Sequence, residues 1–372
     1  DMGFITSRPI ITKANNGSTV VIVSNGLNST NDDPALFIYD LFTGTRLAKL
    51  LPIEKGGNDV FDNNGLSAAT GVDQDVDGDV DYMYAGDMKG NVWKFDLSDN
   101  NPNNWEVANN DYPLYSAKDS TGTITQSISG GIAIGFDAEF NPWLYFGTGR
   151  YLTAGDPSTT SVQTWYGIVD ESTNTTIAGR GALKARKIVA AGELDNGSGT
   201  GVKVRAFEPQ EFPSGVSDMY GKKGWYIDLV NPPFTAAQKV GERIVGTPVV
   251  RGTTVLVSSI IPSEDPCTVE GSGYVNAVDA LTGSSGVYGS ESYFDVNGGG
   301  FDNDKLVSTI DGREISIGSI DLGIKMPTDA LVLAGDTNEL VVVGGSIGGT
   351  GSAPFRGTRA VGRISWHEMI NN

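Results

Sequence analysis

Residues 81–97 read DYMYAGDMKGNVWKFDL, and this stretch decides the fold class of the chain. Two runs rich in aromatic and apolar residues, 81–85 and 91–95, are typical of β-strands. The stretch between them, 86–90, begins and ends with glycine and is typical of a hairpin turn. The segment therefore predicts a β-hairpin.

Runs of the same kind recur along the chain, and their apolar residues follow a period of two rather than 3.6. Helical patterns are scarce, and only residues 363–370 merit consideration as a helix, although Ile364 and Trp366 also suit a strand. The chain is therefore predicted to be all-β. The further expected strands are 19–23, 35–39, 143–146, 165–169, 224–227, 254–258, 273–278 and 339–343.

A loose repeat joins these strands, because several of them end in an aspartate that is followed by a turn. The carboxylate of such a residue accepts backbone N–H groups and holds the corner. The spacing of roughly 50 to 70 residues favours a propeller-like array of four-stranded blades with loop insertions, and a pair of β-sandwiches is the alternative. We expect a single domain over residues 1–372, with the Gly-rich 344–357 as a loop. The repeated aspartates are Asp40, Asp96, Asp170 and Asp279, with Asp228 as a weaker member.

Composition excludes several classes of protein. The chain has 372 residues, 50 of them Gly, and a formal net charge of −19, which argues against nucleic acid or an anionic membrane as a partner. A single cysteine, Cys267, excludes a disulfide framework, and a single histidine, His367, excludes a multi-histidine zinc site. No apolar run approaches the ~18 residues of a membrane span.

The abundance of Gly, Asn, Ser and Thr, with few Lys, favours an exported protein, although acidic Gly-rich cytosolic β-proteins also exist. The chain opens Asp1-Met2-Gly3, so we expect a processed product or a piece of a longer protein.

The densest charge lies just before the hairpin, where residues 73–81 read DQDVDGDVD. Such alternation turns the side chains at positions 1, 3 and 5 toward one point, and Gly78 at position 6 allows the tight turn. Position 7 ordinarily binds the ion through its main-chain carbonyl. Position 9 completes the coordination of the ion directly or through water. Hard oxygen ligands on a flexible loop favour Ca²⁺ over Mg²⁺. The predicted ligands are Asp73, Asp75, Asp77, Asp79 through its main chain, and Asp81.

This turn is not an EF-hand, because its twelfth position is Tyr84 and a strand follows instead of a helix. Another segment would have to replace the missing bidentate Glu. Asp87 is a conceivable donor, but its place in the sequence assigns it to the next hairpin turn. The alternative to a calcium site is an acidic surface turn without metal.

A second stretch, residues 295–304, reads DVNGGGFDND and has a similar character. Its fifth position is Gly299, where the calcium pattern has an acid, and its later acids do not fall at the positions of that pattern. We expect a Gly-rich turn there, with a second calcium site as the alternative. His367 is expected to be a packed or surface residue, and Cys267 either a lone thiol or a buried small residue.

Several of these segments, in order along nearly the whole chain, resemble the C-terminal domain of the PilY1/PilC family. This is a family of type IV pilus-associated adhesins and biogenesis factors. The segments that carry the resemblance are 63–67 (NNGLS), 73–81, 84–97, 145–152 (YFGTGRYL), 260–263 with Pro266 and Cys267, and 362–366 (GRISW).

The resemblance implies a modified quinoprotein-like β-propeller, seven-bladed in the family, with calcium on the 73–81 turn. In the family, calcium in this turn is tied to pilus extension, and its absence permits motor-driven retraction. Members are exported to the periplasm, outer membrane, pilus tip or cell surface, and carry a variable N-terminal region not matched here. The family has more sequence ahead of the turn than the 72 residues present here, so we expect missing front blades or a shortened member.

We therefore expect a calcium-regulated pilus module without catalysis, whose partners are minor pilins or the secretin complex and a host or surface receptor. The alternative is a quinoprotein dehydrogenase that binds pyrroloquinoline quinone, suggested by residues 277–283, AVDALTG. Many such enzymes stack the quinone on a vicinal disulfide, which one cysteine cannot form. A carbohydrate- or receptor-binding propeller is a third reading and overlaps with adhesion.

Overall fold

The computed structural model describes the chain in seven ranges, 2–5, 7–52, 64–172, 174–263, 271–286, 291–335 and 339–357. Residues 363–370, Cys267 and His367 lie outside these ranges. Within them the regular structure is β-strand, apart from short 3-10 helices. These are η1 (Pro102–Asn104), η2 (Asn109–Asp111), η3 (Asp156–Ser158), η4 (Arg180–Ala182), η5 (Pro213–Gly215) and η6 (Ala236–Gln238).

The first half of the chain forms three antiparallel sheets, the third of which also has one parallel pair. The first has the order β1-β2-β3-β4, with β1 (Ile10–Lys13), β2 (Thr19–Ser24), β3 (Leu36–Asp40) and β4 (Arg46–Leu50). The second has the order β5-β6-β7-β8, with β9 also on β7: β5 (Thr70–Val72), β6 (Tyr82–Gly86), β7 (Asn91–Asp96), β8 (Glu106–Val107) and β9 (Tyr115–Ser116). The third has the order β10-β11-β12-β16-β13, with β10 (Ala133–Phe136), β11 (Pro142–Gly147), β12 (Thr164–Val169), β13 (Lys184–Arg186) and β16 (Gly224–Asp228).

The second half adds a six-stranded sheet and two small ones. The large sheet has the order β14-β15-β22-β19-β18-β17, with β14 (Ile188–Asp195), β15 (Gly201–Phe207), β17 (Val249–Arg251), β18 (Thr254–Pro262), β19 (Gly271–Asp279) and β22 (Ser319–Ile320). The small sheets are β20 (Lys305–Val307) with β21 (Glu314–Ser316), and β23 (Leu331–Leu333), β24 (Glu339–Gly344) and β25 (Thr350–Phe355).

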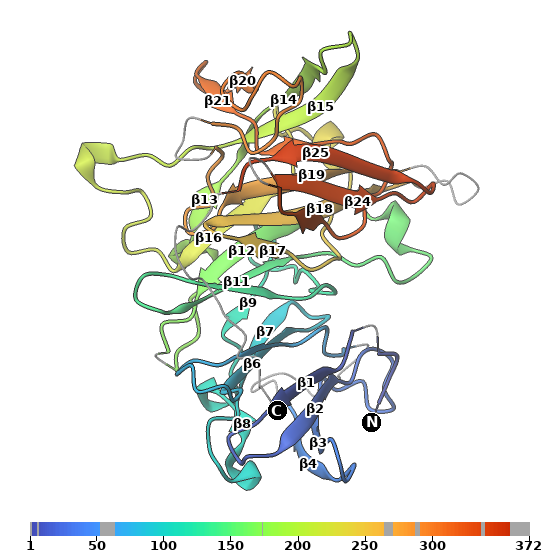
Figure 1. Ribbon diagram of the computed structural model, residues 1–372, viewed down its shortest axis with the longest axis vertical. Helices are drawn as coiled ribbons and strands as arrows, with labels where there is room; N and C mark the ends of the chain where they lie inside the picture. Colours follow the sequence, from blue (N-terminus) through green and yellow to red (C-terminus); the bar gives the residue numbers. More distant parts are fainter. Residues whose placement is uncertain are drawn as a thin grey trace.

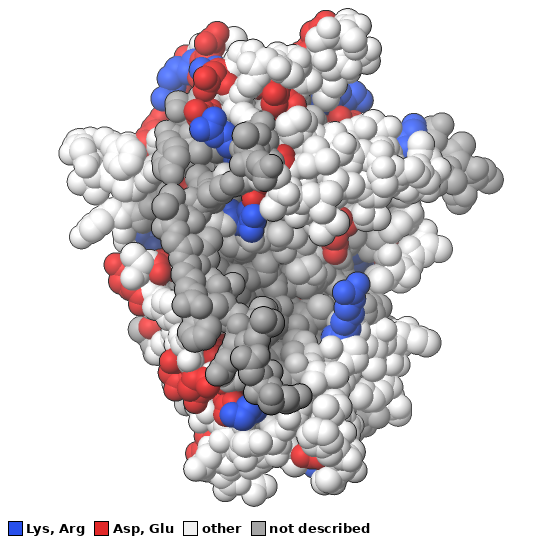
Figure 2. Space-filling model, in the orientation of Figure 1, with Lys and Arg blue, Asp and Glu red and all other residues white. Residues whose placement is uncertain are grey.

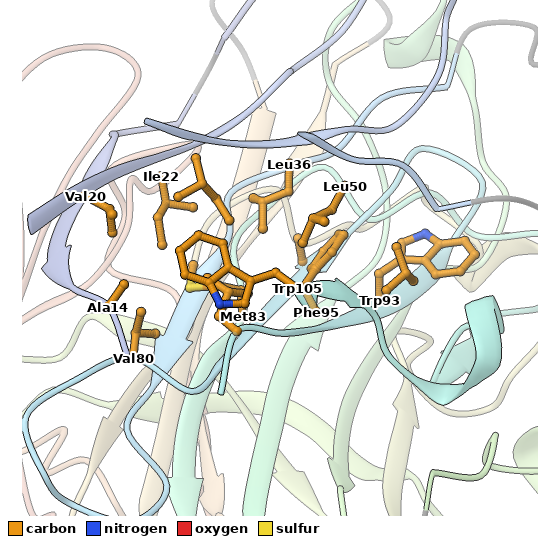
Figure 3. Packing of buried hydrophobic residues seen from close by; sticks show 14 of the residues in the cluster. Ala14, Val20, Ile22, Leu36, Leu50, Val80, Met83, Trp93, Phe95 and Trp105 are labelled. Carbon is orange, nitrogen blue, oxygen red and sulfur yellow. The ribbon is translucent and has the colours of Figure 1, made fainter. Parts of the chain in front are cut away.

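The middle strand of each large sheet is buried on both faces. In β6, Met83 and Ala85 belong to the apolar cluster shared with the first sheet, whereas Tyr84 belongs to the cluster shared with the third. Because side chains alternate across a strand, the consecutive apolar residues of β6 supply two opposite apolar faces. Figure 3 shows the first of these clusters, in which Val20 and Ile22 of β2 face Met83.

Successive sheets therefore pack against one another through separate cores. One cluster joins the first and second sheets, another the second and third, a third the third and the six-stranded sheet, and a fourth that sheet and β23–β25. Figure 1 shows the sheets following one another along the long axis, with β24 and β25 beside β18 and β19. The described residues confirm the predicted all-β class, and packing of each small sheet against the next is also how neighbouring blades of a β-propeller meet. The number of blades stays a prediction.

The repeated aspartates hold corners as predicted. Asp40 Oδ1 accepts the N–H groups of Phe42 and Thr43, at 3.1 and 2.7 Å, and Asp279 Oδ1 does the same for Leu281 and Thr282. Asp228, the weaker member, differs because its carboxylate binds the guanidinium of Arg180 at 2.7 Å.

Asp170 holds its corner and also links two sheets. Its Oδ1 accepts the N–H of Ser172, and its Oδ2 binds Tyr84 Oη and Lys94 Nζ, both at 2.7 Å. All three charged or phenolic groups are buried. The corner of the third sheet is thereby tied to the second sheet.

All the strands expected from the sequence are present, including the 81–97 hairpin. Of the 25 strands in the described residues, fifteen were not predicted. They include β14 and β15, which form a long hairpin, and β25, which lies within the Gly-rich stretch expected to be a loop. β25 pairs with β24 along its whole length. Hydrogen bonding and packing against β24 outweigh the low strand propensity of glycine.

Candidate metal centre

The acidic turn, residues 73–81, connects β5 to β6 and is fixed where it enters β6. Asp81 N–H donates to Val72 O at 2.9 Å, and Leu97 N–H donates to Asp81 O at 2.7 Å. Val80 N–H donates to Lys13 O at 2.9 Å, so the end of the turn also pairs with β1 of the first sheet. In Figure 3, Val80 lies beside Ala14 at one end of the shared core, and these two residues form a β-bridge. The turn therefore lies at the junction of two sheets.

The backbone of the acidic turn curls around its own carboxylates. Two residues have left-handed backbone, Val76 with φ 63° and Gly78 with φ 98°. Gly78 N–H donates to Asp73 Oδ2 at 2.8 Å, and Asp77 N–H lies 3.1 Å from Asp73 Oδ1 and 3.3 Å from Asp75 Oδ1. The N–H groups thus orient the carboxylates toward the inside of the curl.

Three of the predicted ligands come together. Asp73, Asp75 and Asp81 each offer a carboxylate oxygen, and these oxygens all lie within 4.8 Å of one another. Asp81 is buried, Asp73 is half-buried and Asp75 is exposed. Figure 2 shows acidic side chains gathered at the lower left of the molecule, in the neighbourhood of β6. Local desolvation, followed by the negative charges of the neighbouring aspartates, raises the pKa of Asp75.

The other two predicted ligands lie differently. The carboxylate of Asp77 is not part of the triplet, and its Oδ1 accepts the N–H of Asp79 at 2.9 Å. The carboxylate of Asp79 forms an ion pair with Lys13 Nζ at 2.8 Å. Hydrogen bonding to Asp79 and its negative charge raise the pKa of Lys13. Position 7 was expected to bind through its carbonyl and to leave its carboxylate free, whereas the carboxylate of Asp79 is paired with Lys13. The carbonyl ligand stays a prediction.

Two further residues support the triplet and were not found from the sequence. Asn15 Nδ2 lies 3.1 Å from Asp81 Oδ1 and within 3.2 Å of the carbonyls of Val80 and Leu97. Gln74 N–H donates to Asp81 Oδ2 at 2.7 Å. Asn15 is 66 residues from Asp81, so no local pattern could have indicated this contact.

The donor set of the triplet suits one class of ion. Among the described residues, this is the group of three or more His, Cys, Asp or Glu side chains that the structure brings within ligand distance. All its donors are carboxylate oxygens on a glycine-containing turn, which is the chemistry of Ca²⁺ and not of soft metals. The residues present therefore fit a hard divalent cation.

Asp87, considered as a further ligand, belongs to the β6–β7 hairpin turn, as its place in the sequence indicated. It is fully buried, and its carboxylate accepts the N–H groups of Lys89 and Asn91 and the indole N–H of Trp93, at 2.8 to 2.9 Å. Asn64 and Asn91 add amide donors at 3.3 and 3.0 Å. Burial raises the pKa of Asp87, and these hydrogen bonds oppose that shift.

The same turn occurs once more in the next sheet. Asp137 accepts the N–H and amide groups of Asn141 and the indole N–H of Trp143, the last at 3.2 Å. Both turns have the spacing Asp-x-x-x-Asn-x-Trp, a repeat that was not recognised from the sequence alone.

The fold and the acidic turn define a class of protein: a β-propeller that carries a carboxylate-lined turn between two strands of one sheet. The chain matches the family model described as the PilY1 beta-propeller domain over residues 1–197. It therefore belongs to the PilY1 family, as the sequence resemblance predicted.

Named relatives and a solved structure that are similar to this chain support this assignment. A type IV pilus biogenesis factor PilY1 homolog of Xylella fastidiosa is 32% identical over 372 residues, covering 99% of this chain and 27% of the relative. The type IV pilus biogenesis factor PilY1 of Pseudomonas aeruginosa is 29% identical over 309 residues, covering 76% of this chain and 26% of the relative. The crystal structure of the P. aeruginosa PilY1 C-terminal domain has a TM-score of 0.78 and 25% identity, covering 96% of this chain and 72% of that one.

The chain spans about a quarter of the length of these two curated relatives. Within the described residues, none of the helices has the length and apolar character needed to cross a membrane.

Proposed function

We propose that this chain is a calcium-binding regulatory module of a type IV pilus biogenesis factor and adhesin, with no catalysis of its own. The observation that carries the proposal is the convergence of three carboxylates within 4.8 Å in the acidic turn. The matched relatives are named as biogenesis factors and not as enzymes, which supports a non-catalytic role.

In this proposal Asp73, Asp75 and Asp81 hold the ion through their carboxylates. Asp77 would contribute its carboxylate and Asp79 its main-chain carbonyl. Bound calcium supplies two positive charges, which offset the mutual repulsion of the carboxylates. Asn15 and Gln74 keep Asp81 in place, because they hydrogen-bond its two oxygens.

The position of the turn suggests how the ion could regulate. Lys13 and Asn15 of the N-terminal region contact Asp79 and Asp81 directly, and Val80 packs in the core shared by the first two sheets. Ion binding would stiffen this junction and favour one arrangement of the surface around it. We propose that this surface contacts minor pilins or the secretin complex, and that calcium there favours pilus extension over retraction.

The same proposal places the whole protein outside the cytoplasm, in the periplasm, the outer membrane, at the pilus tip or on the cell surface. An exposed site of this kind would sense the calcium of the surroundings. A host or surface receptor would be the partner in adhesion.

Binding can be tested with this chain by terbium luminescence and calorimetry. We expect Asp75→Ala to lower calcium affinity at least about ten-fold, because the ion loses a charged ligand. Asp79→Asn is the matched control from the same turn, since its carboxylate faces Lys13, and it should change the affinity little. Equal affinities of wild type and Asp75→Ala would contradict the ligand assignment.

The regulatory role needs the full-length protein in cells. A pilus-defective strain complemented with wild type, Asp75→Ala or Asp77→Ala would be scored for surface pili and twitching. We expect both variants to show fewer pili or altered twitching than wild type and Asp79→Asn at equal protein levels. Normal pili and twitching in a variant that has lost calcium binding would refute the regulatory role and leave the metal site intact.

A further inference from the structure

A second acidic loop, residues 295–304, lies far from the first along the chain and is closed by its own contacts. Asp295 N–H donates to Pro354 O of β25 at 3.3 Å, and Ile317 N–H donates to Asp304 O at 3.1 Å. Phe301, in the middle of the loop, is buried, and Ser292 N–H donates to its carbonyl at 2.8 Å. The loop thus has a defined shape, set by an apolar anchor and backbone hydrogen bonds.

The carboxylate of Asp304 is incompletely satisfied in this loop. Asp304 has no exposed surface, and its Oδ2 accepts a single long hydrogen bond from Val296 N–H at 3.3 Å, which directs the group toward the start of the loop. Its Oδ1 is buried and finds no hydrogen-bond donor in the part of the chain that the structure describes. A buried carboxylate oxygen without a donor is costly unless a cation or a proton neutralises the group.

The loop carries other side-chain oxygens besides this carboxylate. Asp295 lies close enough for its negative charge to act on Asp304, and its own oxygens accept the N–H groups of Gly298 and Gly300, at 2.7 and 3.2 Å. Asn297 Oδ1, on the same loop, accepts the N–H of Gly299 at 2.7 Å and keeps a second lone pair. The loop therefore carries two carboxylates and an amide oxygen that can offer lone pairs to a cation, and among the described residues Asp304 Oδ1 has no donor.

We propose that the 295–304 loop is a second calcium site, in which Asp304 Oδ1 and the carboxylate of Asp295 bind the ion together with the amide oxygen of Asn297. The two carboxylates match the two charges of the ion, and the donors are oxygens only. The sequence alone favoured a plain Gly-rich turn here, since position 5 lacks an acid. The unpartnered oxygen of Asp304 is what changes that interpretation.

Solvent reaches the loop from one side. Asp295 and Val296 line a hollow of about 560 Å³ between the β14–β15 hairpin and β25. Glu193 and Asp321 also line it, together with Lys203, so its acids outnumber its single lysine and favour the approach of a cation. With two carboxylates instead of the three that converge in the acidic turn, this site should bind calcium more weakly than the first.

The test is the number of calcium ions bound per chain, measured by equilibrium dialysis and elemental analysis on four proteins. We expect two ions for wild type, one for Asp75→Ala, one for Asp304→Asn, and two for Asp302→Asn. The last is the matched control, because Asp302 is an exposed acid of the same loop. Asp304→Asn should lower affinity at the second site at least about ten-fold and leave terbium binding at the first site unchanged.

One ion for wild type and none for Asp75→Ala would overturn the second site and leave the proposed function standing. It would mean that a proton satisfies Asp304. Two ions retained by Asp75→Ala would instead contradict the first site. Should Asp304→Asn fail to fold, the ion count of Asp75→Ala still decides whether a second site exists. Asp295→Asn gives an independent variant with a less buried side chain.

Discussion

The two turns that flank β6 deal with negative charge in opposite ways. At the β6–β7 hairpin, the single carboxylate of Asp87 is fully buried and receives N–H groups from Lys89, Asn91 and Trp93. At the β5–β6 turn, five aspartates share a few backbone donors, and the oxygens of three of them lie within 4.8 Å. The first turn is complete with protein atoms alone, whereas the second has more negative charge than the protein neutralises.

This difference in charge and donors distinguishes an acid that stabilises a turn, such as Asp87, from an acid that is a candidate metal ligand. Burial alone does not distinguish them, because Asp81 in the acidic turn is also buried. What distinguishes them is the balance of donors and charges around the carboxylate. A buried acid surrounded by N–H groups stabilises a turn, and an acid surrounded by other acids is stabilised by a cation or a proton.

The largest effect is expected from Asp87→Ala. It leaves several buried N–H groups without an acceptor, so we expect a loss of about 3 kcal/mol or more in the free energy of unfolding. The loss should be equal in calcium and in chelator, and urea denaturation measures it. Asp137→Ala is the matched control: Asp137 accepts the corresponding bonds from Asn141 and Trp143 but is half-buried, so its loss should be smaller. A loss that depends on calcium would assign Asp87 to the metal site.

Asp75→Asn should act in opposite directions with and without calcium. In chelator it relieves repulsion among the aspartates, so the melting temperature should rise slightly. In calcium it removes a charged ligand, so the ion should stabilise the variant less than wild type. Thermal unfolding in both conditions checks this. A fall in melting temperature in chelator would show that the carboxylates do not repel one another.

The raised pKa of Asp75 predicts a pH dependence in the same turn. The folded chain keeps this proton at pH values above 3.8 at which the unfolded chain has released it. In chelator, the contribution of Asp75 to stability should therefore fall as the pH rises from 3.8 through its raised pKa, and Asp75→Asn should remove that slope.

Calcium competes with the same proton, so calcium affinity should fall as the pH is lowered from about 7 to about 4. Calorimetric titrations at several pH values measure this decrease. An affinity independent of pH would mean that the ion is not held by titrating carboxylates.

The smallest effect is expected from Lys13→Gln. The side chain of Lys13 is 58% exposed, so its ion pair with Asp79 adds little to stability. Removing its positive charge from the edge of the site should raise calcium affinity roughly two-fold at low salt, and the gain should vanish at high salt. A large loss of affinity would instead show that Lys13 positions the turn.

The sequence by itself determined the features that depend on neighbours along the chain. The period-two strands, the 81–97 hairpin and the corners at Asp40 and Asp279 were all predictable, because alternation and turn formation are local. The acidic turn was recognisable for the same reason: its candidate ligands lie within nine residues, and the curl of this short segment brings the carboxylates of three of them together.

Only the tertiary structure decided which oxygens meet and which remain unpartnered. Asn15 reaches Asp81 across 66 residues, and Lys13 takes the carboxylate of Asp79, because the first two sheets pack together through one core. Within the described residues, Asp304 Oδ1 likewise lacks a donor because segments distant in sequence bury it. Burial and the balance of charge are set by packing between segments distant in sequence, and no pattern of neighbouring residues records them.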